Sequence, residues 1–433
     1  MINKLFTFVA LIATTFAGSY PVMGQKSGPI TDTIYMGAGY NNEVYYSMSA
    51  GNKGAVNRKQ WDIAFRASRM SASILTNDAS NNNAISLAGV ELYAYPKSDT
   101  SGWATVDTAG FYSWKKLVNS TTDWETGAFC QNQKGHPDYG WGKYNTASHD
   151  VVGDSLFIIK LRDGSLRKIW IMRKYSSLNV IDFRFANLDG TNDNKISLDC
   201  SPYSTKNFVG YNLVDNQIVD FEPVATTQWD LLFAKYMYTY PDGVLYPVVG
   251  VLNNYDVKVD KFEHVSLDYK AFDLAAMDST RSPIGWEWKK LNASYTYDIV
   301  DSTVYFVQDK SGNIHKLVFK EFVGTSTGRI VFQKEMISAL GFAEVEKSSF
   351  NVAVYPNPVS EVMNLVVNPG KSVNTMVSIM DISGKIVFAQ QYELQSEVLT
   401  TLRIPVTALR TGMYVVVVQS GANRISQKVV INN

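Results

Sequence analysis

Cysteine and histidine are scarce in this sequence, with two cysteines and four histidines among 433 residues. Cys130 and Cys200 are too few for a disulfide framework. Nothing in their spacing places the two sulfur atoms within bonding distance, so a disulfide between them stays an open question. Two isolated thiols without neighbouring histidines also lack the ligand spacing of a zinc site. The sequence therefore predicts no metal centre.

An excess of charge of either sign is also missing. The chain carries 40 Lys and Arg and 40 Asp and Glu, so its formal net charge is zero. No basic stripe interrupts this balance, which argues against nucleic acid and against anionic membrane surfaces as partners. After the N-terminal apolar run, no segment of the sequence approaches the ~20 apolar residues of a membrane-spanning helix. We therefore expect no transmembrane segment.

Sequence signatures of catalysis are absent as well. There is no His-Glu-x-x-His, no Gly-x-Ser-x-Gly and no glycine-rich phosphate loop. The few histidines leave little room for acid–base chemistry near neutral pH. We therefore expect no enzyme. Glycoside hydrolysis needs only two carboxylates and has no such signature, so a secreted hydrolase remains an alternative.

Aromatic residues are abundant instead, with 25 Tyr, 21 Phe and 9 Trp. Such residues favour half-buried β-strands, and helical periodicity is scarce throughout the chain. The sequence predicts an all-β fold with two repeated antiparallel β domains, each a sandwich or half-barrel. A small Ig-like β-sandwich is expected at the C-terminus.

The N-terminus has the pattern of a signal peptide. Lys4 is followed by the apolar run 5–12, then by small residues that end at Gly24. A basic start, a short apolar core and a small-x-small site are typical of export signals. We predict that residues 1–24 are removed by cleavage after Gly24. Export through the oxidising periplasm would permit a disulfide.

Four short motifs follow one another in the last part of the chain. Their residues are Tyr355, Pro356, Asn357 and Pro358, then Gly384 and Lys385, then Gly412 and Tyr414, and finally the strand 428–431. Together they resemble the type A C-terminal sorting domain of the type IX secretion system of Bacteroidota. The resemblance implies handling by that machinery, and a place in the medium or on the outer-membrane surface. The alternative is an ordinary Ig-like module.

β-branched runs separated by turn residues support a sandwich in this region independently of the family. We expect strands at 364–367, 377–380, 385–388 and 414–418. The sorting domain should span residues 351–433, after a linker at 339–350.

The middle of the chain contains a duplication. Trp61-Asp-Ile-Ala-Phe recurs as Trp229-Asp-Leu-Leu-Phe, 168 residues later, and a Tyr-rich run precedes each copy. Tyr139-Gly-Trp recurs as Ile284-Gly-Trp. We expect Trp61 and Trp229 to be core residues and the aspartate beside each to accept a hydrogen bond from a turn. Together with a third block, the hairpin described next, these blocks recur in the same order and indicate two repeats. We place the repeats at residues 25–195 and 196–338.

The third repeated block predicts a β-hairpin in each copy. Apolar alternation runs up to Asp163-Gly164 in the first copy and to Ser311-Gly312 in the second, and then resumes. Asp-Gly and Ser-Gly supply the positive φ of a tight hairpin turn. Both repeats therefore read as mainly antiparallel β.

At these blocks the chain resembles the HmuY-like family of surface haem-binding proteins, over roughly residues 31–335. The Trp-Asp-Ile-Ala-Phe strand and the late hairpin carry the resemblance. It implies that haem is a possible cofactor, with its iron held by two His or Met side chains. The second copy has no His or Met shortly after Trp286, so we expect it to bind no haem alone.

Three residues of the first copy are candidate haem ligands. His136 lies in a polar, glycine-rich loop with aromatic residues at 131–141, His149 lies 13 residues further on and could converge with it, and Met70 follows the first strand block. The alternative assigns both histidines to exposed loop or strand-edge positions and Met70 to the core. His264 and His315 are expected to point outward.

These observations leave three functions open. The first is a secreted or surface-attached ligand-binding protein with an unidentified small ligand, possibly haem. The second is a structural or adhesive surface protein that does not bind haem. The third is the secreted hydrolase.

Overall fold

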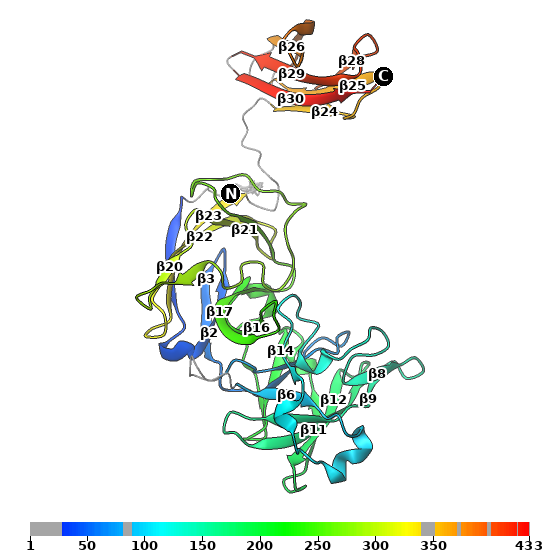
Figure 1. Cartoon of the computed structure of the whole chain (residues 1–433), viewed down its shortest axis with the longest axis vertical. Coiled ribbons are helices and arrows are strands. Elements are labelled where there is room, and N and C mark those ends of the chain that lie inside the picture. Colours follow the sequence, from blue (N-terminus) through cyan, green and yellow to red (C-terminus); the bar gives the residue numbers. More distant parts are fainter. Residues whose placement is uncertain are drawn as a thin grey trace, which may run out of the picture. The chain divides into compact units, whose positions relative to one another are not determined.

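The computed structural model describes residues 28–80, 89–338, 351–369, 374–395, 400–421 and 423–432. The chain forms two compact units, Met1–Phe342 and Ala343–Asn433. Almost all regular structure is antiparallel β-strand, as Figure 1 shows, which confirms the all-β prediction. The predicted signal peptide and the predicted linker 339–350 lie outside the described residues. Short 3₁₀ helices occur at Ala38–Tyr40, Thr100–Thr105, Phe111–Ser113, Ala128–Cys130, Ser201–Tyr203 and Thr226–Gln228.

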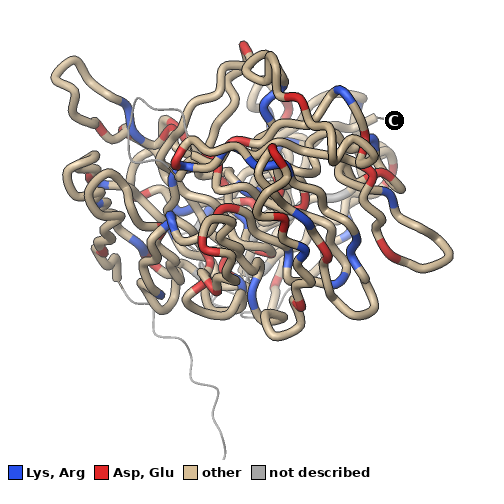
Figure 2. The backbone as a smooth tube through the Cα atoms, turned by 90° about the horizontal axis from the view of Figure 1, so that it is seen from below, with Lys and Arg blue, Asp and Glu red and all other residues tan. Residues whose placement is uncertain are grey.

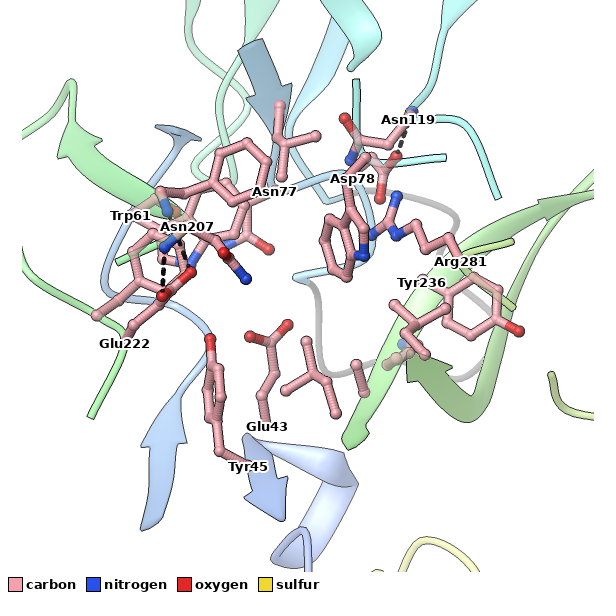
Figure 3. Close-up of a pocket in the computed structure, with 18 of the residues that line it drawn as sticks. Glu43, Tyr45, Trp61, Asn77, Asp78, Asn119, Asn207, Glu222, Tyr236 and Arg281 are labelled. Atoms are coloured by element: carbon pink, nitrogen blue, oxygen red, sulfur yellow. Dashed lines mark hydrogen bonds between the residues drawn. The ribbon is translucent and has the colours of Figure 1, made fainter. Parts of the chain in front are cut away.

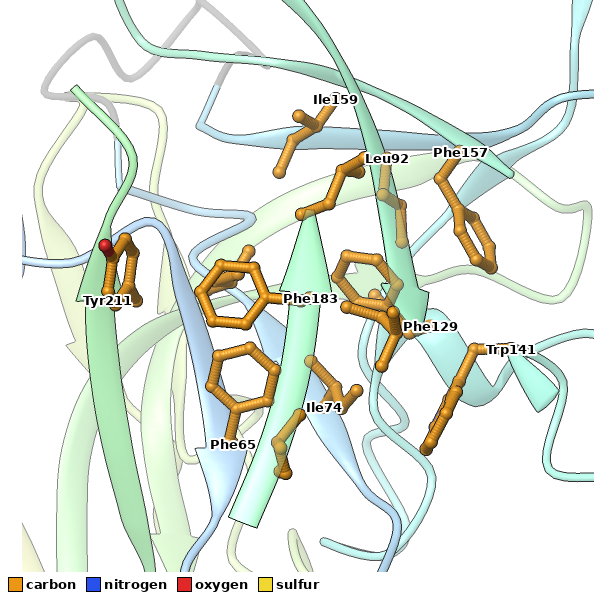
Figure 4. Packing of buried hydrophobic residues seen from close by; sticks show 14 of the residues in the cluster. Phe65, Ile74, Leu92, Phe129, Trp141, Phe157, Ile159, Phe183 and Tyr211 are labelled. Atoms are coloured by element: carbon orange, nitrogen blue, oxygen red, sulfur yellow. The ribbon is translucent and has the colours of Figure 1, made fainter. Parts of the chain in front are cut away.

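Two sheets form a first lobe from residues 58–80 and 89–225. One has the order β15-β14-β4-β5, and the other has the order β13-β12-β11-β10-β6-β7, with the β8–β9 hairpin attached to β11. The bounds are β4 Ile63–Arg66, β5 Ile74–Thr76, β6 Glu91–Ala94, β7 Lys116–Leu117, β8 Gly142–Asn145, β9 Asp150–Gly153, β10 Phe157–Lys160, β11 Leu166–Tyr175, β12 Val180–Asn187, β13 Asn194–Asp199, β14 Phe208–Asn212 and β15 Gln217–Val219. Buried side chains of both sheets meet in one core, where Phe65, Phe183 and Tyr211 pack together (Figure 4).

A second lobe is formed by residues 28–57 and 226–338. Its sheets have the orders β17-β16-β2-β3 and β1-β23-β22-β21-β18, and β19 and β20 form a separate hairpin. The bounds are β1 Ile30–Tyr35, β2 Asn42–Ser47, β3 Gly51–Asn57, β16 Leu231–Thr239, β17 Leu245–Asn253, β18 Lys258–Phe262, β19 Lys289–Leu291, β20 Tyr297–Ile299, β21 Val304–Gln308, β22 Ile314–Phe322 and β23 Arg329–Ser338. Its core lies between the two sheets.

The lobes exchange strands between the two predicted repeats. β2, from the first repeat, pairs with β16, and β14, from the second repeat, pairs with β4. In Figure 1 the blue β2 lies beside the green β16. Each Tyr-rich strand therefore pairs with the Trp-Asp strand of the other copy. The pairing crosses the predicted boundary at 195/196 in both directions, and the two lobes belong to one compact unit.

The repeated aspartates hold this exchange at equivalent points. Asp62 accepts a hydrogen bond from the backbone N–H of Leu213 at 2.8 Å, and Asp230 accepts one from the N–H of Met48 at 2.7 Å. Each acceptor satisfies a buried donor just beyond the exchanged strand. The prediction that both aspartates accept such a bond is confirmed. The donors lie on the other copy.

The sheet that contains β4 and the sheet that contains β16 are each buried on both faces. In β4, Ile63 and Phe65 belong to the first-lobe core, whereas Ala64 belongs to a separate cluster with Trp61 and Trp229. β16 alternates in the same way, so this third cluster joins the lobes. Strands buried on both faces read as continuous apolar runs. This explains the two Trp-Asp blocks and confirms both tryptophans as core residues.

Both predicted late hairpins are present. β10 and β11 are joined through Gly164 at φ 87°, and β21 and β22 are joined through Gly312 at φ 85°. Only glycine adopts these values without a steric penalty. The hairpin prediction is therefore confirmed in both copies.

The structure revises one pairing within the repeat. The β8–β9 hairpin begins directly after Trp141, and the β19–β20 hairpin begins directly after Trp288. Both tryptophans are buried in the cores of their own lobes, whereas Trp286 is only partly buried. The counterpart of Trp141 is therefore Trp288, because the buried anchor precedes the hairpin in both lobes.

The second unit is the predicted small β-sandwich. Its sheets have the orders β24-β25-β28 and β27-β26-β29-β30 around one apolar core. The bounds are β24 Asn351–Tyr355, β25 Val362–Asn368, β26 Asn374–Asp381, β27 Ile386–Glu393, β28 Thr400–Pro405, β29 Gly412–Ser420 and β30 Asn423–Ile431. The four strands expected from β-branched runs are all present.

The four sorting motifs lie at strand ends, turns and contacts between strands of this sandwich. Asn357 donates a side-chain bond to the carbonyl of Lys428 at 3.1 Å and accepts one from the N–H of Val430 at 2.8 Å. The first motif is thereby fastened to the last strand. Gly384, at φ 83°, lies in the turn between β26 and β27. Tyr414 donates its hydroxyl to the carbonyl of Arg410 at 2.8 Å, which secures the start of β29.

Candidate functional site

The three predicted haem-ligand candidates lie in one surface pocket of the first lobe. Met70 comes from the loop after β4, His136 from the loop before β8, and His149 from the turn between β8 and β9. The pocket, called here the imidazole pocket, has a volume of 590 Å³. Its lining residues are Arg69, Met70, Ser71, Ala72, His136, Tyr139, Tyr144, His149, Val151, Lys174 and Ser176.

Tyr144 contacts both imidazoles of the pocket. Its ring centroid lies 5.3 Å from that of His136 and 6.1 Å from that of His149. Its hydroxyl is hydrogen-bonded to Nδ1 of His149 at 2.7 Å. A bond at Nδ1 orients an imidazole and leaves Nε2 available, which is the usual arrangement of a metal-binding histidine. The hydrogen bond from Tyr144 therefore orients the His149 ring within the pocket.

The floor of the pocket is rigid and cationic. Lys174 is 1% exposed, and its ammonium donates to the carbonyls of Ser68 (2.7 Å) and Ser71. Burial lowers the pKa of Lys174 to about 8. The indole Nε1 of Trp141 donates to the carbonyl of Ala72 at 2.9 Å. These bonds fix the loop that carries Met70, so the pocket is built on ordered backbone.

The upper part of the pocket is open to solvent. Both histidines are exposed, and Met70 is 87% exposed rather than part of the core. Imidazole and thioether groups are established ligands of haem iron. Among the described residues, no group of three or more His, Cys, Asp or Glu side chains could hold a metal ion. The pocket therefore presents imidazole and thioether groups at an open surface.

The other two histidines lie elsewhere, in the second lobe. His264 is exposed, as expected. The expectation for His315 is wrong, because it is 2% exposed and its Nε2 is hydrogen-bonded to Asp309 at 2.8 Å. His315 shares the core-facing side of β22 with Leu317 and Phe319, so the strand alternation turns it inward.

Cys130 and Cys200 are both free and buried. Cys130 donates weakly to the carbonyl of Ala72 at 3.6 Å, and burial raises the pKa of its thiol to about 12. Such a thiol is unreactive near neutral pH. Both cysteines belong to the first-lobe core, where they pack as small apolar residues.

A second polar site, missed by sequence reasoning, lies where the lobes meet. Figure 3 shows Glu43, Asp78, Glu222 and Arg281 around a cavity of 50 Å³, called here the joint cavity. All four are at least nine-tenths buried. Glu222 accepts from the backbone N–H of Asn207 at 2.8 Å. The available signal was a carboxylate within an apolar strand, as at Glu43 in β2, but only the assembled lobes show it to be buried.

Burial shifts the titration of these carboxyl groups upward. Desolvation raises the pKa of Glu43 and of Glu222 to about 7, and that of Asp78 to about 6. Arg281 opposes this shift for Glu43 and Asp78 through its charge. The cavity is far smaller than the ~300 Å³ of typical ligand pockets. The joint cavity is therefore too small for an organic ligand, and the charges of its buried groups affect the stability of the junction between the lobes.

Lys and Arg of the described segments are not separated from Asp and Glu. In the view of Figure 2, Lys and Arg are mixed with Asp and Glu along the chain. Among the described residues, no helix has the length and hydropathy of a membrane span.

Comparison with known families identifies the C-terminal unit. Residues 353–432 match the family described as the secretion system C-terminal sorting domain. This tail marks the chain as cargo of the type IX secretion system of Bacteroidota, destined for secretion or for attachment at the cell surface. No curated protein matches the chain. The resemblance of the two repeats to HmuY-like proteins stays a prediction.

Two solved structures show limited likeness. PorZ, a surface component of the type IX secretion system of Porphyromonas gingivalis, is 10% identical with a TM-score of 0.16. The alignment covers 73% of this chain and 50% of PorZ, so the chain spans about half of that structure. The ectodomain of the C. elegans fusion protein EFF-1 is 7% identical over 64% of this chain and 68% of its own length, with a TM-score of 0.16. Neither score supports a shared fold.

Proposed function

We propose that this exported protein binds an iron porphyrin in the imidazole pocket of its first lobe. The observation that carries the proposal is the convergence of His136, His149 and Met70. Each was chosen from the sequence for its ligand chemistry, and the three come from separate loops.

The size and charge of the pocket suit this ligand. Its 590 Å³ lies within the range of organic-ligand sites, roughly 300–1,000 Å³. The lining includes Arg69 and Lys174 but no Asp or Glu. Because haem carries two anionic propionates, cationic walls without carboxylates favour it. Haem would supply the iron, and His149 with His136 or Met70 would hold it.

The second lobe lacks this set of ligands. Counted from the buried tryptophan before each hairpin, Pro283 stands in place of His136 and Thr296 in place of His149. The proposal therefore predicts one haem per chain. It involves no catalytic step.

A haemin titration of the whole mature chain tests the proposal. We expect a Soret shift that saturates at one equivalent with micromolar or tighter affinity. His149→Ala should weaken binding by at least about tenfold, the equivalent of roughly 1.4 kcal/mol. His136→Ala and Met70→Leu identify which residue supplies the second ligand. The matched control is His264→Ala, an exposed histidine of the second lobe.

The whole chain is required because of the strand exchange. A fragment 25–195 would lack β14, the partner of β4, and would carry β2 without its partner β16. Absence of a Soret shift, or a shift unchanged by both histidine substitutions, would contradict the proposal. Binding to cells without haem binding would then favour the structural or adhesive function.

A further inference from the structure

A cleft in the second lobe occupies the position of the imidazole pocket but has different chemistry. It has a volume of 400 Å³ and is called here the aromatic cleft. Its lining residues are Tyr40, Lys235, Tyr240, Tyr246, Pro247, Val248, Val249, Trp286, Lys289, Lys290, Leu291, Tyr297 and Thr325.

The repeat makes the two pockets equivalent. The register of β4 with β5 matches that of β16 with β17, which makes Val249 the counterpart of Ala72. Trp286 corresponds to Tyr139, because each precedes the buried tryptophan of its hairpin by two residues. All four residues line their respective pockets. Duplication has therefore produced the same concavity twice, with different side chains.

Aromatic rings dominate the second concavity. The ring of Tyr240 lies 6.0 Å from that of Trp286 and 6.4 Å from that of Tyr246. The strands β16 and β17 are longer than their counterparts β4 and β5, and the extended hairpin brings Tyr240, from its turn, and Tyr246, from β17, into the lining. Tyr246 is 47% exposed. An exposed ring over an apolar floor offers a stacking surface for a flat ligand face.

The polar groups of the cleft are cationic or neutral. Three lysines line it, and its thirteen residues include no Asp or Glu. Lys289 is 5% exposed, donates to the carbonyls of Val249 and Trp286, and has its Nζ 4.2 Å from the ring centroid of Trp288, and burial lowers its pKa to about 7. Lys290, next to it, is exposed. A ligand that carries a negative charge would be attracted here.

We propose that the aromatic cleft is a second binding site, and that it takes an acidic saccharide, a sugar ring bearing a carboxylate. The C–H face of a pyranose ring stacks on tyrosine and tryptophan rings. The tyrosine hydroxyls and Thr325 offer hydrogen bonds to sugar hydroxyls, and the exposed ammonium of Lys290 pairs with the carboxylate. The absence of His and Met from this lining separates its ligand from that of the imidazole pocket.

Calorimetric titration of the whole chain with an α-1,4-linked galacturonic acid trisaccharide tests the proposal. The matched neutral probe is the galactose trisaccharide, which has a hydroxymethyl group in place of each carboxylate. We expect the acidic probe to bind at least about tenfold more tightly than the neutral one, a difference of roughly 1.4 kcal/mol. Its affinity should fall as salt is raised, since screening weakens exposed charge pairs.

Two exposed residues supply substitutions that preserve the fold. Tyr246→Ala and Lys290→Ala should each weaken the acidic probe by about tenfold, the upper range for a single aromatic or charged contact. Tyr295→Ala is the matched control, because Tyr295 is 85% exposed on the β19–β20 turn and lies outside the lining. His149→Ala should leave saccharide binding unchanged, which keeps this test independent of haem.

Three results would overturn the proposal. Equal affinity for the acidic and neutral trisaccharides would remove the role of the lysines. Binding of neither trisaccharide would remove the saccharide itself. Binding of benzoate, a simple aromatic carboxylate, in place of the trisaccharide would assign the cleft to planar aromatic acids.

Discussion

Replacing Trp229 with alanine should destabilise both lobes together. Its side chain is 1% exposed, and its ring meets that of Tyr45 edge-on with centroids 5.0 Å apart. Truncating a buried tryptophan to alanine typically costs about 3–5 kcal/mol. Its indole Nε1 has no hydrogen-bond partner among the described residues, so the loss is one of packing. We expect about 4 kcal/mol for the unit as a whole.

The shared effect follows from where the ring lies. Trp229 belongs to the cluster that joins the lobes, together with first-lobe residues such as Ala64 and Phe208. Loosening that cluster uncovers the outer face of the sheet that contains β4 and β14. Hydrogen exchange measured by mass spectrometry should therefore show lower protection in β4 as well as in β16.

A matched substitution sharpens the test. Trp288→Ala removes an equally buried tryptophan from the second lobe's own core. It should lower protection mainly in β16 and β22, with a smaller effect on β4. Protection of β4 that is unchanged by Trp229→Ala would refute the coupling, and the lobes would then be independent domains.

Three further predictions follow from the contacts described. The pKa of Glu43 is about 7 in the folded state, whereas the unfolded chain releases this proton near pH 4.5. The protonated carboxyl therefore contributes its full stabilisation of the fold below pH ~4.5, and this stabilisation is lost as the pH rises through about 7. The free energy of unfolding of Glu43→Gln, measured by urea denaturation, should therefore increase relative to that of the wild type by on the order of 3 kcal/mol from pH 4.5 to pH 8. The control, Glu287→Gln at an exposed position, should show no such increase. Asp230→Ala leaves the N–H of Met48 without its acceptor and should cost about 1–3 kcal/mol in the same assay, with no loss refuting its role in the strand exchange. Deleting residues 409–433 removes β29 and β30, so the protein should remain in the periplasm on fractionation. Normal surface display of that deletion would contradict the need for these strands.

Local patterns in the sequence determined much of the architecture. Gly164 and Gly312 specify tight turns by their backbone freedom, so both hairpins could be predicted without knowledge of their neighbours. The β-branched runs of the C-terminal unit predict strands because such side chains pack well on a pleated sheet, and its four motifs identify the export route. Repetition of Trp61 at Trp229 revealed two equivalent core positions.

Strand partners and pocket composition were decided only by the tertiary structure. A Tyr-rich strand has the same local pattern whether it pairs within its own repeat or with the other one. The exchange depends on long-range contacts such as the bond from Met48 to Asp230. The inward side of His315 was misjudged because strand alternation alone does not say which face meets a core.

The candidate sites divide in the same way. His136, His149 and Met70 could be named from the sequence because imidazole and thioether groups have recognisable ligand chemistry. Their meeting in one pocket depends on three loops that only the folded lobe places together. The aromatic cleft has no sequence signature, and the joint cavity has only the carboxylate of Glu43 within a strand, because tyrosine, lysine and glutamate acquire a shared role only when folding brings distant segments into contact.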